Sequence, residues 1–200
     1  MNNCSFNELM EIDEKCNAEL HQAVIKEMLN IDRDGITSFV KWLKTETDFF
    51  TAPASTKYHG AKLQGLVEHS FNVFIVLNDL CKNIYPADTI ALVSLFHDVC
   101  KANYYSSYLR NVKNEETGDW EKVESYKIDE QFPYGSHGGK SVYLLMSHGI
   151  NLSDEEATAI NCHMGGWDST VYHNPNGAFN KYPLALYLHI ADMMATYLYD

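Results

Sequence analysis

His97 and Asp98 are the two adjacent residues of this chain best placed to do chemistry. They end the apolar run Ile90-Ala-Leu-Val-Ser-Leu-Phe96. An imidazole beside a carboxylate at the end of a buried helix is costly unless something pairs with them. A divalent metal ion is the usual partner of these two side chains. The pair therefore predicts a metal site.

Four more residues with the same ligand chemistry accompany this pair: His69, His137, His163 and Asp192. Neutral imidazole nitrogen and carboxylate oxygen suit divalent ions such as Fe, Mn, Ni, Co, Zn or Mg. We expect two such ions, with Asp98 as the bridge between them. Ions about 3.5–4 Å apart activate water at neutral pH and clamp a phosphoryl group.

Lys101 follows Asp98 by three residues. We expect it to hold a substrate phosphate or to act as an acid near the leaving group, so that Asp98 and Lys101 form the catalytic pair. The alternative is an exposed lysine at a helix end.

Three other residues have expected roles around the metal ligands. His59 and Lys62 precede the helix that carries His69, so we expect them to contact substrate at the pocket entrance or else to lie on a solvated face. His189 lies one turn before Asp192 and is expected to orient the ligands rather than to bind metal. For Trp167 a packed aromatic is favoured over a ring that stacks on a base.

The hydrophobic periodicity predicts a mostly α-helical fold. We expect helices over residues 6–30, after 32–34, over 61–83, up to His97-Asp98, and over 138–147, 153–162 and 184–199. Asp88 is expected as an N-cap, and Ser153 with Glu156 fits a capping box. Aromatic-rich runs around a Gly-containing turn predict a β-hairpin inserted over 104–126. The chain is interpreted as one domain (1–200), with N-terminal helices in 1–55 and the metal-binding core in 56–200.

Composition limits the function classes. The net charge of −12, from 15 basic and 27 acidic residues, argues against an extended nucleic-acid surface. Five scattered cysteines without a CxxC pair are typical of reduced thiols. The N-terminal residues lack the pattern of a signal peptide, and no apolar run reaches the roughly 20 residues that cross a bilayer. We therefore expect a cytoplasmic protein without a membrane partner.

The order His, His-Asp, His, His, Asp resembles the HD-domain superfamily of metal-dependent phosphohydrolases, which has an all-α helical bundle. Three local segments carry the likeness: Tyr58-His-Gly-Ala-Lys-Leu-Gln-Gly-Leu-Val-Glu-His-Ser70, Leu95-Phe-His-Asp-Val-Cys-Lys101 and Leu188-His-Ile-Ala-Asp192. The likeness covers about Thr56 to the C-terminus. The motifs Gly-Leu-Val-Glu-His and Ser-His-Gly-Gly are most similar to the catalytic domain of certain 3′–5′ exoribonucleases. No segment before Thr56 resembles the oligonucleotide-binding domain of those enzymes.

The resemblance implies a division of the ligands. It gives His69, His97, Asp98 and Asp192 to a first metal ion. It gives His137 and His163 to a second, with Asp98 shared. The implied reaction is hydrolysis of a phosphoester, and we expect a small phosphorylated substrate such as a nucleotide or short oligonucleotide. Two alternatives stay open: a di-iron oxygenase of the same fold, and a non-enzymatic, metal-stabilised module that senses or binds nucleotides.

Overall fold

Helices form most of the chain, which we describe from a computed structural model over residues 17–129, 136–167 and 175–199. The elements follow in the order α2 (Ala18–Leu29), α3 (Ile36–Glu46), α4 (Gly65–Cys81), α5 (Ala87–Phe96), β1 (Tyr105–Lys113), β2 (Trp120–Ile128), α6 (His137–Ser147), α7 (Asp154–Cys162), α8 (Pro175–Lys181) and α9 (Pro183–Leu198). Short 3-10 turns lie at Val99–Lys101 and Gly165–Trp167. The expected mostly helical fold with one β-hairpin is confirmed.

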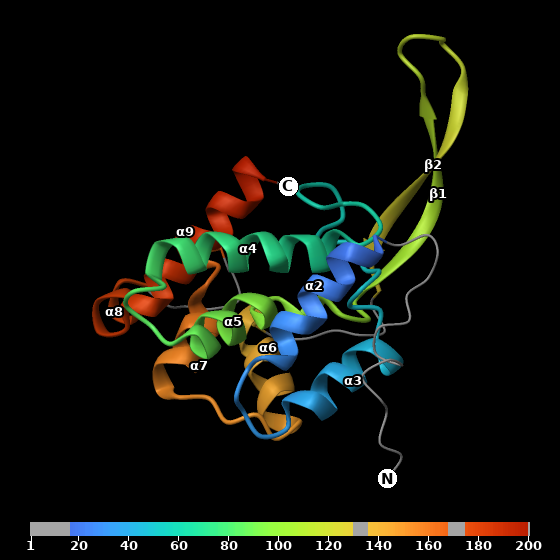
Figure 1. Cartoon of the computed structure of the whole chain (residues 1–200). Helices are drawn as coiled ribbons and strands as arrows, with labels where there is room; N and C mark the ends of the chain where they lie inside the picture. Colours follow the sequence, from blue (N-terminus) through green and yellow to red (C-terminus); the bar gives the residue numbers. More distant parts are fainter. Residues whose placement is uncertain (1–16, 130–135, 168–174, 200) are drawn as a thin grey trace.

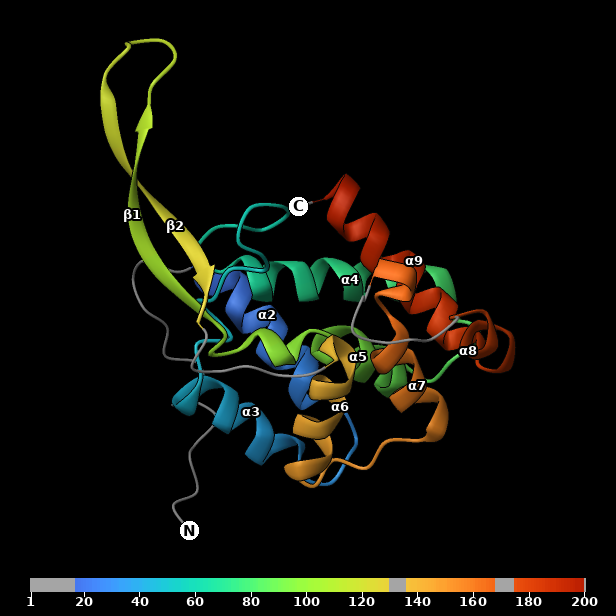
Figure 2. The same ribbon diagram turned by 180° about the vertical axis from the view of Figure 1, so that it is seen from behind.

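Helix α5 lies in the centre of the helical body. In Figures 1 and 2, α4 and α9 lie on one side of it and α6 and α7 on the other. Every residue of α5 from Thr89 to Phe96 is buried, which explains its continuous apolar sequence. Burying one Leu or Phe side chain stabilises a fold by about 1.5–3 kcal/mol. The His97-Asp98 pair comes directly after this buried helix in the sequence.

Helix α4 begins later than the sequence pattern predicts. It starts at Gly65 rather than near Ala61, because Gln64 has a left-handed backbone (φ 67°). The chain folds back tightly here: a Cβ on Gly65 would lie 1.9 Å from the carbonyl oxygen of Gly60. Leu63, within the range expected to be helical, precedes the helix and is exposed.

The observed helix caps agree only in part with the caps that were predicted from the sequence. The Ser153 capping box is confirmed, since its hydroxyl accepts from Glu156 N–H and the Glu156 carboxylate accepts from Ser153 N–H. The expected Asp88 N-cap is wrong. Pro86 holds the N-cap position of α5, and Asp88 lies in the first turn, where it pairs with Arg33 at 2.8 Å. The short helix α8 was not predicted, and the 6–16 part of the first expected helix lies outside the described residues.

The hairpin is confirmed as an antiparallel pair in which Tyr105 opposes Ile128 and Leu109 opposes Glu124. It projects from the helical body (Figures 1 and 2). In the described part of the chain, the helices are all too short or too polar to cross a membrane.

Candidate metal centre

His97 and Asp98 lie at the end of α5 and are almost fully buried. The Nδ1 atom of His97 lies 2.7 Å from the carbonyl oxygen of Ser94. A carbonyl can only accept, so Nδ1 carries the ring proton and Nε2 presents its lone pair. This is the tautomer and orientation found in metal-binding histidines.

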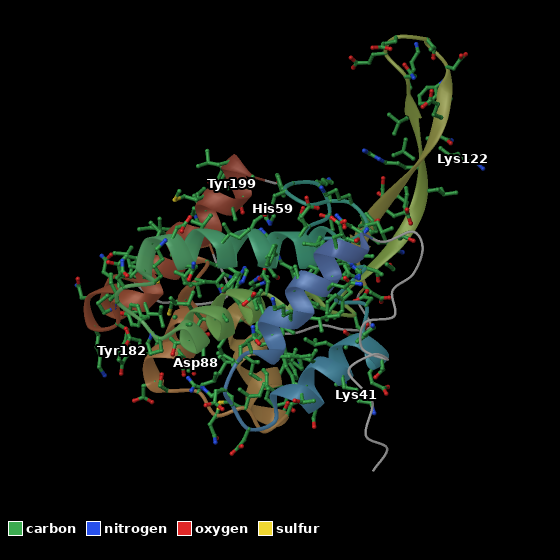
Figure 3. The ribbon with its side chains drawn as sticks, viewed as in Figure 1. Lys41, His59, Asp88, Lys122, Tyr182 and Tyr199 are labelled. Atoms are coloured by element: carbon green, nitrogen blue, oxygen red, sulfur yellow. The ribbon has the colours of Figure 1, made fainter. Side chains whose placement is uncertain are left out.

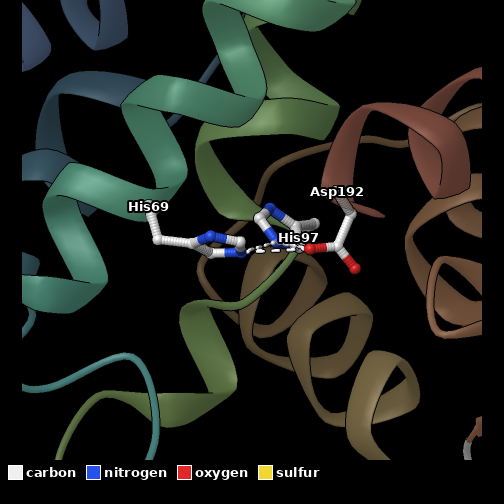
Figure 4. A group of neighbouring side chains, drawn as sticks. All are labelled: His69, His97 and Asp192. Atoms are coloured by element: carbon white, nitrogen blue, oxygen red, sulfur yellow. Dashed lines mark hydrogen bonds and ion pairs between the residues drawn. The ribbon is translucent and has the colours of Figure 1, made fainter. Parts of the chain in front are cut away.

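His69 of α4, His97 and Asp192 of α9 form the first group of ligand atoms (Figure 4). His69 Nε2 lies 3.1 Å from Asp192 Oδ1 and 3.3 Å from His97 Nε2. The three ligand atoms all lie within 4.8 Å of one another. Three helices that are far apart in sequence thus bring two imidazoles and a carboxylate to one point, a donor set that suits a divalent ion.

His163 joins His97 and Asp98 in a second group. It is the C-cap residue of α7, and its Nδ1 donates to the carbonyl oxygen of Ile160 at 2.6 Å. Its Nε2 is buried, lies 3.4 Å from Asp98 Oδ1 and makes no hydrogen bond to any residue that the structure describes. A buried polar atom left unpaired is costly. A cation bound between this nitrogen and the Asp98 carboxylate would remove that cost, so the residues fit a metal ion.

His137 approaches Asp98 from the first turn of α6, and its Nε2 contacts Asp98 Oδ1. Close packing of α6 on α7 permits this contact. A Cβ on Gly138 would lie 2.3 Å from the carbonyl oxygen of Ile160, so only glycine fits there. Asp98, Cys100 and His137 form a third group of ligand atoms within 4.8 Å of one another.

Asp98 is the centre of the electrostatic network. Its Oδ2 lies 2.6 Å from Lys101 Nζ. Burial alone would raise the pKa of Asp98, but Lys101, His97 and His137 outweigh it and hold that pKa well below its usual range. Burial would lower the pKa of Lys101, and Asp98 raises it instead. Asp98 is therefore a carboxylate and Lys101 an ammonium, and the exposed-lysine alternative is wrong, since Lys101 is buried.

The histidines differ in charge according to their neighbours. Burial lowers the pKa of His163, which keeps its ring neutral. Burial also acts to lower the pKa of His137, but interactions with Cys100 and Asp98 raise it to about 10. In Asp192 burial acts to raise the pKa, and the bond to His69 outweighs it, so the carboxyl is ionised.

A cavity of about 620 Å³ opens onto the cluster. Its polar lining is His59, Asp98, Lys101, His189, Asp192 and Thr196. Its apolar and aromatic lining is Tyr58, Met164, Trp167, Met193 and Tyr197. Two of the candidate metal ligands, Asp98 and Asp192, thus line an open space of substrate size.

Two residues expected at the pocket entrance lie in different places. His59 lines the cavity, and its ring lies 4.8 Å from that of His69. Burial, with His69 and Lys101, lowers the pKa of His59 to about 4, so this ring is neutral at pH 7. Lys62 is absent from the lining of the cavity described above, and its ammonium pairs with Glu68 at 2.8 Å. Figure 3 shows His59 beside the helical body and Lys122 out on the hairpin.

Near the last helix, His189 donates from Nδ1 to the carbonyl oxygen of His163 at 2.6 Å, so it is bonded to the backbone of a candidate ligand. Trp167 is 69% exposed at the cavity rim, so the packed-aromatic interpretation is wrong. Cys100, Met164, Met193 and Tyr197 were missed by the sequence reasoning. For Cys100 a signal existed, because it follows Asp98 by two residues.

Comparisons of the chain with known protein families, with curated proteins and with solved structures found no significant match.

Proposed function

We propose that this chain is a metal-dependent phosphohydrolase of the HD-domain superfamily that acts on a nucleotide or a short oligonucleotide. The observation that carries the proposal is the His163 Nε2 atom, which is buried beside Asp98 without a hydrogen bond to a described residue. Its Nδ1 donates a hydrogen bond to the carbonyl oxygen of Ile160, so Nε2 carries the lone pair and faces the cluster. A buried imidazole lone pair beside a carboxylate supports the interpretation that a cation binds there.

The residues of the cluster divide between two ions in this proposal. His69, His97, Asp98 and Asp192 hold the first, and His137 and His163 hold the second, with Asp98 between them. A bound divalent ion supplies Lewis-acid polarisation of a phosphoryl oxygen and lowers the pKa of a water molecule. The reaction is attack of water on phosphorus, with cleavage of the phosphorus–oxygen bond to the leaving group, which takes up a proton.

Lys101 supplies a fixed positive charge beside the reacting phosphate. Its ammonium is buried, lines the cavity and is held by Asp98 at 2.6 Å. Such a preorganised charge stabilises negative charge that develops on phosphoryl oxygens. It can also hold a proton for the leaving oxygen.

The rim of the cavity supports a substrate with a planar ring. Tyr58, Trp167 and Tyr197 are 82%, 69% and 70% exposed and all line the cavity. Exposed aromatic faces next to a phosphate-binding centre are the groups on which nucleobases stack. This supports a nucleotide more than a simple alkyl phosphate.

The test combines metal analysis with a substrate panel. The protein is stripped with a chelator, reloaded separately with Mg²⁺, Mn²⁺, Fe²⁺, Co²⁺, Ni²⁺ or Zn²⁺, and its metal content is measured. Hydrolysis is then followed with p-nitrophenyl phosphate, bis(p-nitrophenyl) phosphate, nucleoside monophosphates and dinucleotides. Asp98→Asn is compared with Asp79→Asn, a matched change at an exposed position of α4.

We expect bound metal and turnover in the wild type and in Asp79→Asn, and a loss of about 10²–10³-fold in Asp98→Asn. Bound metal with no turnover of any phosphoester would contradict the hydrolase and favour the binding module. Oxygen uptake by the iron-loaded protein without phosphoester cleavage would point to the oxygenase.

A further inference from the structure

Cys100 carries a buried thiol within the cluster of candidate metal-ligating side chains. The ligand sets proposed above do not include it. It lies in the 3-10 turn Val99–Lys101, is 3% exposed, and its Sγ lies within 4.8 Å of ligand atoms of Asp98 and His137. Its backbone N–H donates to Ser141 Oγ at 3.1 Å. Ser141 belongs to α6, the helix that carries His137, so this bond fixes the thiol relative to that imidazole.

A second observation at the same place indicates a cation. His163 Nε2 is fully buried, finds no hydrogen-bond partner among the described residues and lies 3.4 Å from Asp98 Oδ1. The same carboxylate oxygen contacts His137. The ring centroids of His137 and His163 are 5.3 Å apart. Asp98 thus belongs to two groups of possible ligands, one with His97 and His163 and the other with Cys100 and His137.

We propose that the Cys100 thiolate is a ligand of the second metal ion, together with Asp98, His137 and His163. This inference rests on the proposed metal centre. On binding, the sulfur–hydrogen bond is replaced by a sulfur–metal bond and the proton leaves to solvent. No oxidant or reductant is needed. Because thiolate is a soft ligand, the second site selects Zn²⁺, Co²⁺ or Fe²⁺ over Mg²⁺ and Mn²⁺.

Cys81 provides the contrast within the same chain. It is equally buried, but its thiol donates to the carbonyl oxygen of Leu77 at 3.0 Å within its own helix. Burial raises the pKa of Cys81 to about 11. Cys81 does not belong to any described group of possible metal ligands, whereas Cys100 does. Cys81→Ser is therefore the matched control for Cys100→Ser.

The test is absorption spectroscopy of the full chain titrated with Co²⁺, with bound cobalt measured in parallel. We expect a thiolate-to-cobalt charge-transfer band in the near ultraviolet as the second equivalent binds. Cys81→Ser retains the band and Cys100→Ser loses it. The affinity of the second equivalent falls at least about 10-fold in Cys100→Ser.

Two further measurements do not depend on the folding of Cys100→Ser. A variant with Cys4, Cys16, Cys81 and Cys162 changed to serine keeps the band if Cys100 is the ligand. X-ray absorption of the wild type loaded with two equivalents of zinc shows a zinc–sulfur distance of about 2.3 Å. Two bound cobalt ions with neither a band nor a sulfur scatterer would overturn the Cys100 assignment and leave the metal centre standing. No bound cobalt in the wild type would overturn the metal centre itself, and the Cys100 assignment with it.

Discussion

The Nε2 atom of His163 lies 3.4 Å from Oδ1 of Asp98, and the two residues come from the ends of different helices, α7 and α5. The nitrogen has a lone pair because Nδ1 donates its proton to Ile160. The carboxylate is ionised because Lys101, His97 and His137 surround it. A lone pair and an anion facing each other in a buried place are held together best by a cation between them.

Without metal, removal of one partner of the buried Asp98–Lys101 ion pair should destabilise the fold. Asp98→Asn leaves a buried ammonium without its anion, so we expect a loss of about 3–5 kcal/mol of unfolding free energy. The double variant Asp98→Asn/Lys101→Met recovers part of that loss because it also removes the buried charge. Urea denaturation with a chelator present measures both. A loss below about 1 kcal/mol in the single variant would show that the pair is solvated.

Gly138→Ala tests how α6 positions His137. The added methyl group would meet the carbonyl oxygen of Ile160 at 2.3 Å, so α6 must move away from α7. We expect a loss of about 1–3 kcal/mol of stability and weaker binding of the second metal equivalent. Gly177→Ala, where a Cβ has no described neighbour within 4 Å, is the control and should be neutral or stabilising. Equal behaviour of the two variants would contradict this role of the helix contact.

The positions of His69, His97, His163 and Asp192 among the candidate ligands could be predicted from the sequence because each lies at a helix C-terminus or interrupts an apolar helical face, whereas His137 begins a helix. His69 and Asp192 interrupt apolar faces of α4 and α9, and His97 ends α5. Burial without a partner is costly for such groups, so their presence in apolar surroundings is itself a signal.

The residues that the sequence misplaced depend on tertiary packing or on backbone turns. Lys62 was expected at the pocket entrance, but the left-handed turn at Gln64 starts α4 later, and Lys62 pairs with Glu68. Trp167 was expected to be a packed aromatic, and nothing local to the sequence shows that it lines a cavity rim. The cysteines were interpreted as reduced thiols because they lack a CxxC pair, and that criterion cannot detect Cys100, whose possible co-ligand His137 comes from another helix.

Trp167→Ala tests the class of substrate. We expect KM for a nucleotide substrate to rise about 5- to 150-fold, which corresponds to the roughly 1–3 kcal/mol of one base–aromatic stack, with kcat unchanged. Trp120→Ala is the matched control, because Trp120 is 70% exposed on the hairpin and Trp167 is 69% exposed. Steady-state kinetics with a nucleoside monophosphate measure both. An unchanged KM in Trp167→Ala would exclude stacking on this ring.

The stability of the fold should fall in acid through Glu156, a buried carboxylate in the first turn of α7, at the opposite end of that helix from His163. Burial acts to raise the pKa of Glu156, but hydrogen bonds from Ser153 N–H, Thr89 and Arg33 outweigh it and lower that pKa below its ordinary value of 4.5. The carboxylate therefore stabilises the fold above pH 4.5, and this contribution is lost as the pH falls through the lowered value.

Glu156→Gln measures that contribution. At pH 7 we expect the variant to lose about 1.5–3 kcal/mol of unfolding free energy, and the difference from wild type should shrink as the pH falls below 4.5. Urea denaturation between pH 7 and pH 3 provides the comparison. Glu124→Gln, an exposed change on the hairpin, should show no such trend. A difference that stays constant with pH would mean that Glu156 acts through its shape rather than its charge.

The most direct test of the metal centre is X-ray diffraction from crystals of the metal-loaded protein at the absorption edge of the bound metal. We predict one anomalous peak bounded by His69, His97 and Asp192 and a second bounded by Asp98, His137 and His163. The absence of any peak in this cluster, with Lys101 still paired to Asp98 and His163 Nε2 still without a partner, would contradict the central claim.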